Sequence, residues 1–251
     1  MHVCNIHWKS ALLGKKTAMN VLLPETGEPP FPVFYLLHGR SDDYTAWLVN
    51  TRIESYAGRY PMIVVMPDGY LGFYTDIEGG PAYARHIGEE LVDLVDRTFP
   101  TRAERAGRAI GGLSMGGYGA LRVGLVHRNR FSSVHSHSGA LMHGSRPAVD
   151  GRDHHYPEVF GTDPRGTAHD LCRLATDAAK AGDAPAIRID CGVDDFLIED
   201  NRAYREALRK TGMPHTYEEH EGAHDWDYWD RHIPSALAFH ARNLGIAASS
   251  H

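Results

Sequence analysis

The segment Gly112-Leu113-Ser114-Met115-Gly116 places a serine between two glycines, in a G-x-S-x-G pattern. A strand-like run (108–111) precedes it, and a segment rich in small residues (116–127) follows it. A sharp turn from a strand into a helix exposes the central hydroxyl, and the flanking glycines let the turn close without Cβ clashes. The helix N-terminus adds N–H groups and partial positive charge beside that hydroxyl. The pattern predicts a nucleophilic Ser114; the alternative is an ordinary packed turn.

A serine hydroxyl is a weak nucleophile, so it needs a base, and the base needs a carboxylate that orients it. For a serine on such a turn, the partners follow in the chain order Ser, acid, His. Asp194 and Asp195 both lie directly after a predicted strand (186–191), and either one could be the acid. His224 lies in a glycine-led turn before the last predicted helix, and it is the predicted base.

The chain has seventeen histidines, so the choice of base needs care. His135 and His137 share one face of a predicted strand and could bind a metal ion, but a third ligand at matching spacing is missing. His155, with its neighbour His154, either contacts substrate or faces solvent. Three more lie at a strand end or within a helix, where a base would be poorly placed: His220, His232 and His240.

The oxyanion of an acyl-transfer intermediate needs two backbone N–H donors. Met115 follows the predicted nucleophile, so its amide is the first candidate. The apolar run 33–37 ends in His38-Gly39-Arg40, and the amide of Arg40 is the second candidate. Arg40 and Met115 therefore form the predicted oxyanion hole, and His38 is predicted to have a structural role.

Apolar strand-like runs alternate with helical patterns, which is typical of an α/β fold with a mostly parallel central sheet and helices on both faces. The runs VFYLL and MIVVM are continuous, as expected for strands buried on both faces. The predicted strands are 2–8 and 16–23, both as edge strands, then 33–37, 62–66, 108–111, 131–137, 186–191 and 215–220. The predicted helices are 82–99, 116–127, 199–211 and 226–244, with a kink or restart at Pro234.

No repeat or long linker divides the chain, which predicts one domain over residues 1–251. The segment 143–168 lacks a clear period and is rich in Gly, Pro, His and Asp, so we expect a lid or substrate-pocket segment there. Trp47, Trp226 and His155 are the predicted substrate-pocket residues. Trp229 lies in the last predicted helix, and we expect it to pack in the core.

Composition excludes several classes of function. The net charge of −6 provides no basic face for nucleic acid. No run of about 18 apolar residues is present, so no membrane partner is expected. Three widely spaced cysteines imply no disulfide framework, and the N-terminus lacks the apolar stretch of a signal peptide. We therefore expect a cytoplasmic location.

Five blocks resemble one known family when they are taken together: HGRSDDYTAW, MPDGYLGFYTD, GGLSMGGYGALR, CGVDDFLIEDN and GAHDWDYW. They are similar to the esterase D family of α/β-hydrolases, which includes S-formylglutathione hydrolases, tributyrin-type acetylesterases, feruloyl esterases and mycolyltransferases. The blocks span residues 33–229, and their combination is more specific than any one of them. The resemblance implies the α/β-hydrolase fold.

The resemblance also implies roles for individual residues. Ser114 corresponds to the nucleophile, His224 to the base and Asp195 to the acid; Asp195 is favoured over Asp194 because the family's acid precedes Phe-Leu. The loop after the third strand lacks the cysteine that S-formylglutathione hydrolases usually carry there, which argues against glutathione thioesters. The ending HDWDYW is closer to the tributyrin-type esterases.

The function implied is a serine carboxylesterase that hydrolyses short-chain acyl esters, from acetyl to butyryl, through an acyl-enzyme intermediate. Five alternatives stay open: an S-formylglutathione hydrolase, a feruloyl esterase, an acyltransferase of the same family, a peptidase on the same fold, and a non-catalytic binding protein. The expected partner is a small-molecule ester, with no cofactor and no metal ion. Formation of a homo-oligomer stays open.

Overall fold

A central eight-stranded sheet organises the computed structural model, which describes residues 1–77, 79–147 and 156–249. The strand order is β1-β2-β4-β3-β5-β6-β7-β8. The pairs β1–β2 and β2–β4 are antiparallel, and all other neighbours are parallel. The strands are β1 (His2–Lys9), β2 (Lys16–Leu23), β3 (Val33–Leu37), β4 (Ile63–Pro67), β5 (Arg108–Leu113), β6 (Ser133–His137), β7 (Ala186–Gly192) and β8 (His215–His220).

The strand predictions agree with this sheet except at one edge. All residues of β3, β4 and β5 are buried. For β3 and β4 the continuous apolar runs predict this, as for strands covered on both faces. The prediction of β2 as an edge strand is wrong. β2 pairs with β1 on one side and with β4 on the other, so six of its eight residues are buried.

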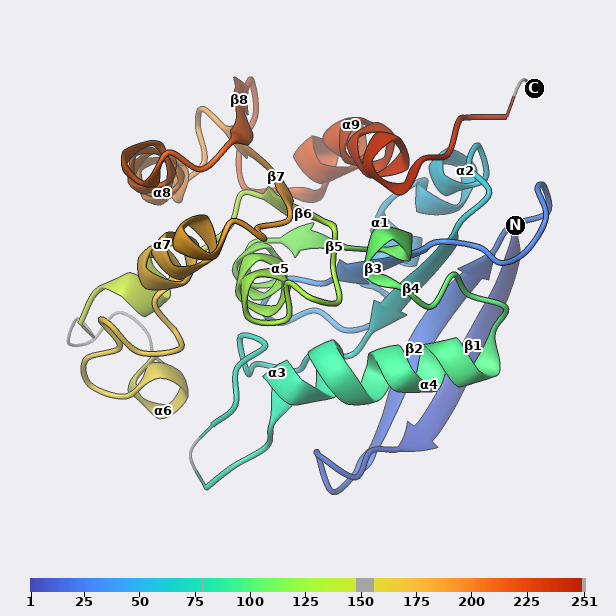
Figure 1. Cartoon of the computed structure of the whole chain (residues 1–251), viewed down its shortest axis with the longest axis horizontal. Coiled ribbons are helices and arrows are strands. Elements are labelled where there is room, and N and C mark those ends of the chain that lie inside the picture. The colour runs from blue at the N-terminus through green and yellow to red at the C-terminus, as the bar shows by residue number, and fades with distance from the viewer. Residues whose placement is uncertain (78, 148–155, 250–251) are drawn as a thin grey trace.

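The helices are named in Figure 1. They are α1 (Ala46–Asn50), α2 (Ile53–Ala57), α3 (Tyr83–Arg85), α4 (Leu91–Thr98), α5 (Met115–Val126), α6 (Tyr156–Phe160), α7 (Leu171–Ala181), α8 (Ile198–Thr211) and α9 (Trp226–Leu244). The predicted helix 82–99 is α3 and α4 joined by a π-helical turn, His86–Glu90. In that turn the Glu90 carboxylate accepts hydrogen bonds from Ser10 and His86, which ties the turn to the end of β1. The helix α9 runs through Pro234 without interruption.

Helices cover both faces of the sheet, and each face has its own apolar core. In Figure 1, α9 and α2 lie above the sheet and α4 lies below it. The upper core is built by α1, α2 and α9 against residues such as Phe34 and Val64. The lower core is built by α4, α5, α7 and α8 against residues such as Tyr35 and Val65. The predicted α/β architecture is confirmed.

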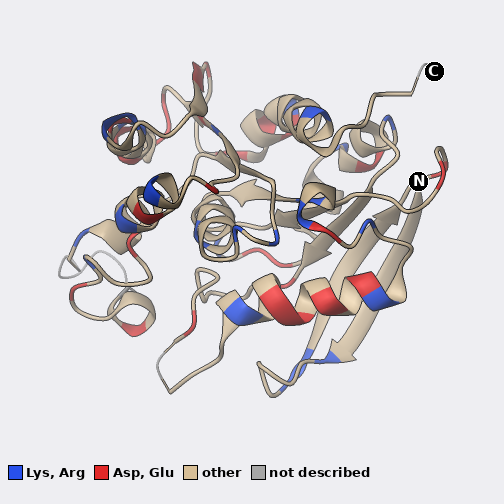
Figure 2. Cartoon of the chain, viewed as in Figure 1, with Lys and Arg blue, Asp and Glu red and all other residues tan. Residues whose placement is uncertain are grey.

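Charged residues of both signs occur on several helices. Figure 2 shows Asp and Glu along the π-helical turn and α4, and Lys and Arg on α7, α8, α9 and the β1–β2 hairpin. Basic residues therefore occur on several elements instead of forming one stripe. Among the described residues, no helix is both long enough and apolar enough to cross a bilayer.

The turn between β5 and α5 has unusual backbone angles. Ser114 has φ 52° and ψ −116°, in a region that side-chain-bearing residues rarely adopt. The chain crosses β3 so closely here that a Cβ on Gly116 would lie 2.6 Å from the carbonyl oxygens of Leu37 and His38. A Cβ on Gly112 would meet the Leu37 oxygen at 2.6 Å. Both glycines are therefore required by close backbone approach, as the sequence pattern predicts.

The last helix is anchored to the sheet by a buried histidine. His240 Nδ1 lies 2.7 Å from Ser133 Oγ, and His240 Nε2 lies 2.7 Å from His135 Nδ1. The His240 ring also packs 4.6 Å from that of Phe34, measured between centroids. Because His240 is fully buried, burial lowers its pKa to about 3, and it stays neutral at neutral pH.

This buried histidine predicts a dependence of stability on pH. In an unfolded chain a histidine takes up a proton near pH ~6.5, whereas His240 in the folded protein does so only near pH 3. Between these values the unfolded chain binds the extra proton, so the free energy of unfolding falls as the pH falls, by up to about 1.4 kcal/mol per pH unit. Urea unfolding between pH 7 and pH 5 should show a shallower fall in His240→Gln than in the wild type. The matched control, His2→Gln at an exposed position, should keep the wild-type slope; equal slopes in all three proteins would contradict the prediction.

Candidate active site

Three side chains from distant parts of the chain form one hydrogen-bonded series. His224 Nε2 lies 3.0 Å from Ser114 Oγ. His224 Nδ1 lies 2.8 Å from Asp195 Oδ2 and 3.0 Å from Oδ1. A carboxylate only accepts, so Nδ1 carries the proton and Nε2 is the acceptor for the serine hydroxyl. The sequence-predicted residues Ser114, Asp195 and His224 are thus brought together in the arrangement that general-base activation of a serine requires.

The structure separates the two neighbouring aspartates. Asp195 is buried, whereas Asp194 is exposed. Burial alone would raise the pKa of Asp195, but hydrogen bonds from His224 and from the Leu197 amide outweigh this and hold the pKa below its usual value. Asp195 therefore stays ionised next to the imidazole, and Asp194 makes no side-chain contact with it.

The loops that carry Asp195 and His224 are hydrogen-bonded to each other. The turn after β7 and the loop after β8 run side by side: the Val193 amide donates to the His220 carbonyl at 2.9 Å, and the Asp194 amide donates to the Gly222 carbonyl at 3.0 Å. Both loops leave the carboxyl ends of parallel strands, as does the Ser114 turn after β5. This common edge is where parallel α/β sheets form their sites.

A second buried carboxylate, Asp190, links the elements beneath this site. Its Oδ1 accepts from His137 Nδ1 at 2.7 Å and from the Tyr228 hydroxyl at 3.0 Å. The His137 carbonyl in turn accepts from the Ser114 amide at 2.9 Å. Burial would raise the pKa of Asp190, but the contact with His137 lowers it below its usual value. These hydrogen bonds fix the relative positions of β6, β7 and the first turn of α9, the elements next to Ser114 and His224.

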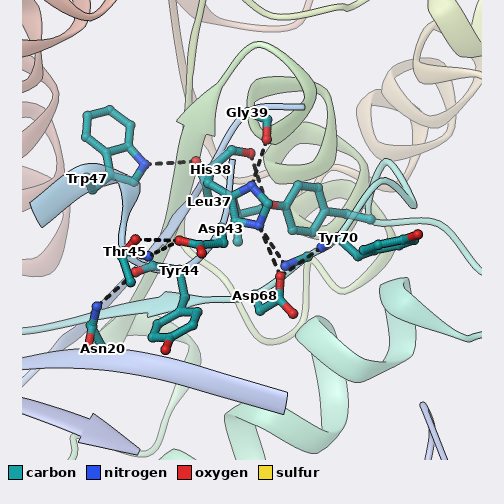
Figure 3. A network of polar contacts seen from close by, with 12 residues as sticks. Asn20, Leu37, His38, Gly39, Asp43, Tyr44, Thr45, Trp47, Asp68 and Tyr70 are labelled. Atoms are coloured by element: carbon teal, nitrogen blue, oxygen red, sulfur yellow. Dashed lines mark hydrogen bonds and ion pairs between the residues drawn. The ribbon is translucent and has the colours of Figure 1, made fainter. Parts of the chain in front are cut away.

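The loop after β3, which carries the predicted oxyanion donor Arg40, is braced by His38. Figure 3 shows this network. His38 Nδ1 donates to the Gly39 carbonyl at 2.7 Å, and Nε2 accepts from the Gly69 amide at 2.8 Å. Trp47 Nε1 donates to the Leu37 carbonyl at 3.0 Å. Both nitrogens of His38 are occupied by backbone groups, which agrees with the structural role predicted for it.

Ser114 and His224 lie on the walls of two pockets that also share Arg40 and Ser41. The larger pocket, of about 640 Å³, is lined in addition by Leu71, Phe73, Met115, Ala140, His143, Phe196 and Leu197. The smaller pocket, of about 330 Å³, is lined in addition by Gly39, Asp42, Leu113, Asp225, Trp226 and Trp229. Both pockets therefore adjoin the residue that carries the serine hydroxyl.

The predicted substrate-pocket residues have different positions. Trp226 lines the smaller pocket. Trp47 is buried behind it, with the two indole rings perpendicular and 5.4 Å apart. His155 lies outside the described residues, and the start of the predicted lid, His143, lines the larger pocket. Sequence reasoning missed Phe196, although its position directly after the acid was a signal that could have identified it.

Comparison with known proteins shows which family the chain belongs to. The Esterase family model matches residues 10–240. The acetyl esterase of Caldicellulosiruptor saccharolyticus is 34% identical over 258 residues, which cover 94% of this chain and 97% of that protein. The range matched by the family model includes all the loops described above.

Two solved structures from Staphylococcus aureus have the same fold. The fluorophosphonate-binding serine hydrolase FphF superposes with a TM-score of 0.88 at 28% identity, covering 95% of this chain and 98% of that one. The S-formylglutathione hydrolase FrmB superposes with a TM-score of 0.85 at 29% identity, covering 96% of this chain and 99% of that one. The family match spans most of the sequence and the neighbours are serine hydrolases, so the chain belongs to the Esterase family and is a carboxylic ester hydrolase with the α/β-hydrolase fold.

Proposed function

We propose that this enzyme hydrolyses short-chain acyl esters, from acetyl to butyryl, with Ser114 as nucleophile, His224 as general base and Asp195 as the orienting acid. The observation that carries the proposal is the hydrogen-bonded series from Ser114 Oγ through the His224 ring to the Asp195 carboxylate. Each contact has the length and the donor–acceptor order that proton transfer from the serine requires.

Acylation begins with attack of Ser114 Oγ on the ester carbonyl carbon. The Oγ–C bond forms while His224 Nε2 takes the hydroxyl proton. The carbonyl oxygen becomes an oxyanion, for which the amides of Arg40 and Met115 are the proposed donors. Met115 is the first residue of α5, where helix geometry leaves the N–H without an intrahelical acceptor. Preorganised donors of this kind are each worth about 10²–10³ in rate.

Collapse of the intermediate breaks the bond between the carbonyl carbon and the alcohol oxygen. His224 Nε2 gives its proton to the leaving alcohol, and the acyl group remains on Ser114. Water then attacks the acyl carbon, with His224 again taking a proton, and Ser114 leaves as the free hydroxyl. Asp195 stays ionised throughout and stabilises the positively charged imidazole between the two proton transfers.

The pocket supports binding of an acyl group, and similarity supports the short-acyl range. The larger pocket has apolar walls, among them Leu71, Phe73 and Ala140, which suit a hydrocarbon group. The relative at 34% identity is an acetyl esterase. We also propose that the chain is a single-domain enzyme over residues 1–251. Of the predicted lid segment 143–168, residues 148–155 lie outside the described residues; its first residue, His143, lines this pocket.

Substitution within the series should separate the two aspartates. On p-nitrophenyl acetate, Ser114→Ala should lose at least about 10⁴ in kcat/KM, because no nucleophile remains. Asp195→Asn should lose about 10⁴ in kcat, because the imidazole would adopt the wrong tautomer. The matched control Asp194→Asn, an exposed neighbour, should stay within about twofold of the wild type. Steady-state kinetics on the purified variants measures all three; full activity in Ser114→Ala would refute the nucleophile assignment.

A series of p-nitrophenyl esters of increasing acyl length tests the substrate range. We expect kcat/KM to be highest between acetate and butyrate and to fall for longer chains. S-formylglutathione, assayed in parallel, should be a poorer substrate than p-nitrophenyl acetate. A maximum at longer acyl chains, or faster hydrolysis of the thioester, would contradict the proposed range while leaving the Ser114 chemistry in place. Product analysis with an added acceptor alcohol would reveal acyl transfer.

A further inference from the structure

Phe196 is an exposed aromatic side chain in contact with His224. It follows Asp195 directly, in the turn between β7 and α8, and 76% of its surface is accessible. Its ring centroid lies 4.4 Å from that of the His224 imidazole, with 50° between the ring planes. Isolated exposed apolar side chains are ordinary in proteins. This one differs because it contacts the proposed base and forms part of the larger pocket wall.

A second aromatic ring contacts the same imidazole. Trp229, which is buried in α9, lies 5.0 Å from the His224 ring and is nearly perpendicular to it, at 87°. Trp226 holds the Trp229 ring in turn, at 5.1 Å and 88°. The His224 side chain is therefore in contact with two aromatic rings from different elements, in addition to its hydrogen bonds with Ser114 and Asp195.

The charge of His224 changes during the proposed reaction, so the energy of its contacts with aromatic rings changes too. When Ser114 attacks, the imidazole becomes an imidazolium. The face of an aromatic ring carries negative electrostatic potential and attracts a cation within about 6 Å of its centroid. The centroids of the Phe196 and His224 rings are 4.4 Å apart, which is within this distance. For an exposed pair the attraction corresponds to about a two- to fivefold effect on a rate.

We propose that Phe196 is a positioning residue for the base: its ring orients the His224 imidazole and stabilises the imidazolium form, and so raises kcat. The inference rests on the proposed roles of Ser114 and His224. A different role for Phe196, as an apolar wall that only binds the acyl group, would change KM instead of kcat. The two roles therefore predict different kinetics for the same variants.

The test compares Phe196→Leu with Phe196→Tyr on p-nitrophenyl acetate. Leucine keeps an apolar side chain but removes the aromatic ring, whereas tyrosine keeps the ring. We expect Phe196→Leu to lower kcat two- to fivefold with KM unchanged, and Phe196→Tyr to keep the wild-type kcat. Because Phe196 is exposed, both variants should fold, which urea unfolding verifies. The matched control is Tyr70→Leu, another exposed aromatic position, at 59%, that is not among the lining residues of either pocket; its kcat should not change.

Three results would overturn the proposal: an unchanged kcat in Phe196→Leu, a raised KM with unchanged kcat, or a kcat in Phe196→Tyr as low as in Phe196→Leu. Ser114→Ala assayed beside these variants distinguishes the two levels of inference. If Ser114→Ala is inactive and Phe196→Leu is fully active, only the role of Phe196 fails. If Ser114→Ala keeps its activity, the proposed function fails and the role of Phe196 fails with it.

Discussion

The sharp turn at Ser114 is the constraint on which the rest of the site depends. A non-glycine residue with φ 52° costs of order 1–3 kcal/mol, so the surrounding structure must compensate. The Ser114 amide donates to the His137 carbonyl, and the Ser114 carbonyl accepts from the amides of Tyr118 and Ala140. Buried packing of β5 and α5 against both neighbouring strands holds the turn from either side. The serine hydroxyl is therefore fixed before any substrate arrives.

Two buried carboxylates five positions apart serve different parts of this arrangement. Asp190 lies within β7 and joins β6 to α9 through His137 and Tyr228. Asp195 lies after the end of the same strand and accepts hydrogen bonds from His224 Nδ1 and from the Leu197 amide. Asp190 therefore holds β6, β7 and α9 together, whereas Asp195 accepts from His224 Nδ1 and so keeps the proton on that nitrogen. Asp190 lies in β7 and Asp195 in the turn that follows this strand, so the position of Asp195 depends on the end of β7.

The order and spacing of Ser114 and His224 were predictable from the sequence because each follows a recognisable strand and a glycine-marked turn. The choice between Asp194 and Asp195 was open from the residues alone, since it depends on which side chain is buried. The helix α7 was missed, although Asp170 and Gly182 mark its ends as capping residues. The π-helical turn and the contact between Phe196 and His224 depend on how distant segments pack together in the fold. The hydrophobic periodicity of the sequence does not show such packing. The residues that line the pockets come from several loops far apart in the sequence, so they too could not be predicted from periodicity.

The long chain separation between Ser114 and His224, 110 residues, has a consequence for biosynthesis. His224 lies immediately before α9, which packs on β5, β6 and β7. A growing chain that has formed the Ser114 turn still lacks His224, so under the proposed mechanism the hydroxyl cannot yet be activated. Non-local contacts of this kind form late in folding. Under that mechanism, ester cleavage during refolding would begin only once α9 has packed on the sheet and brought His224 to Ser114.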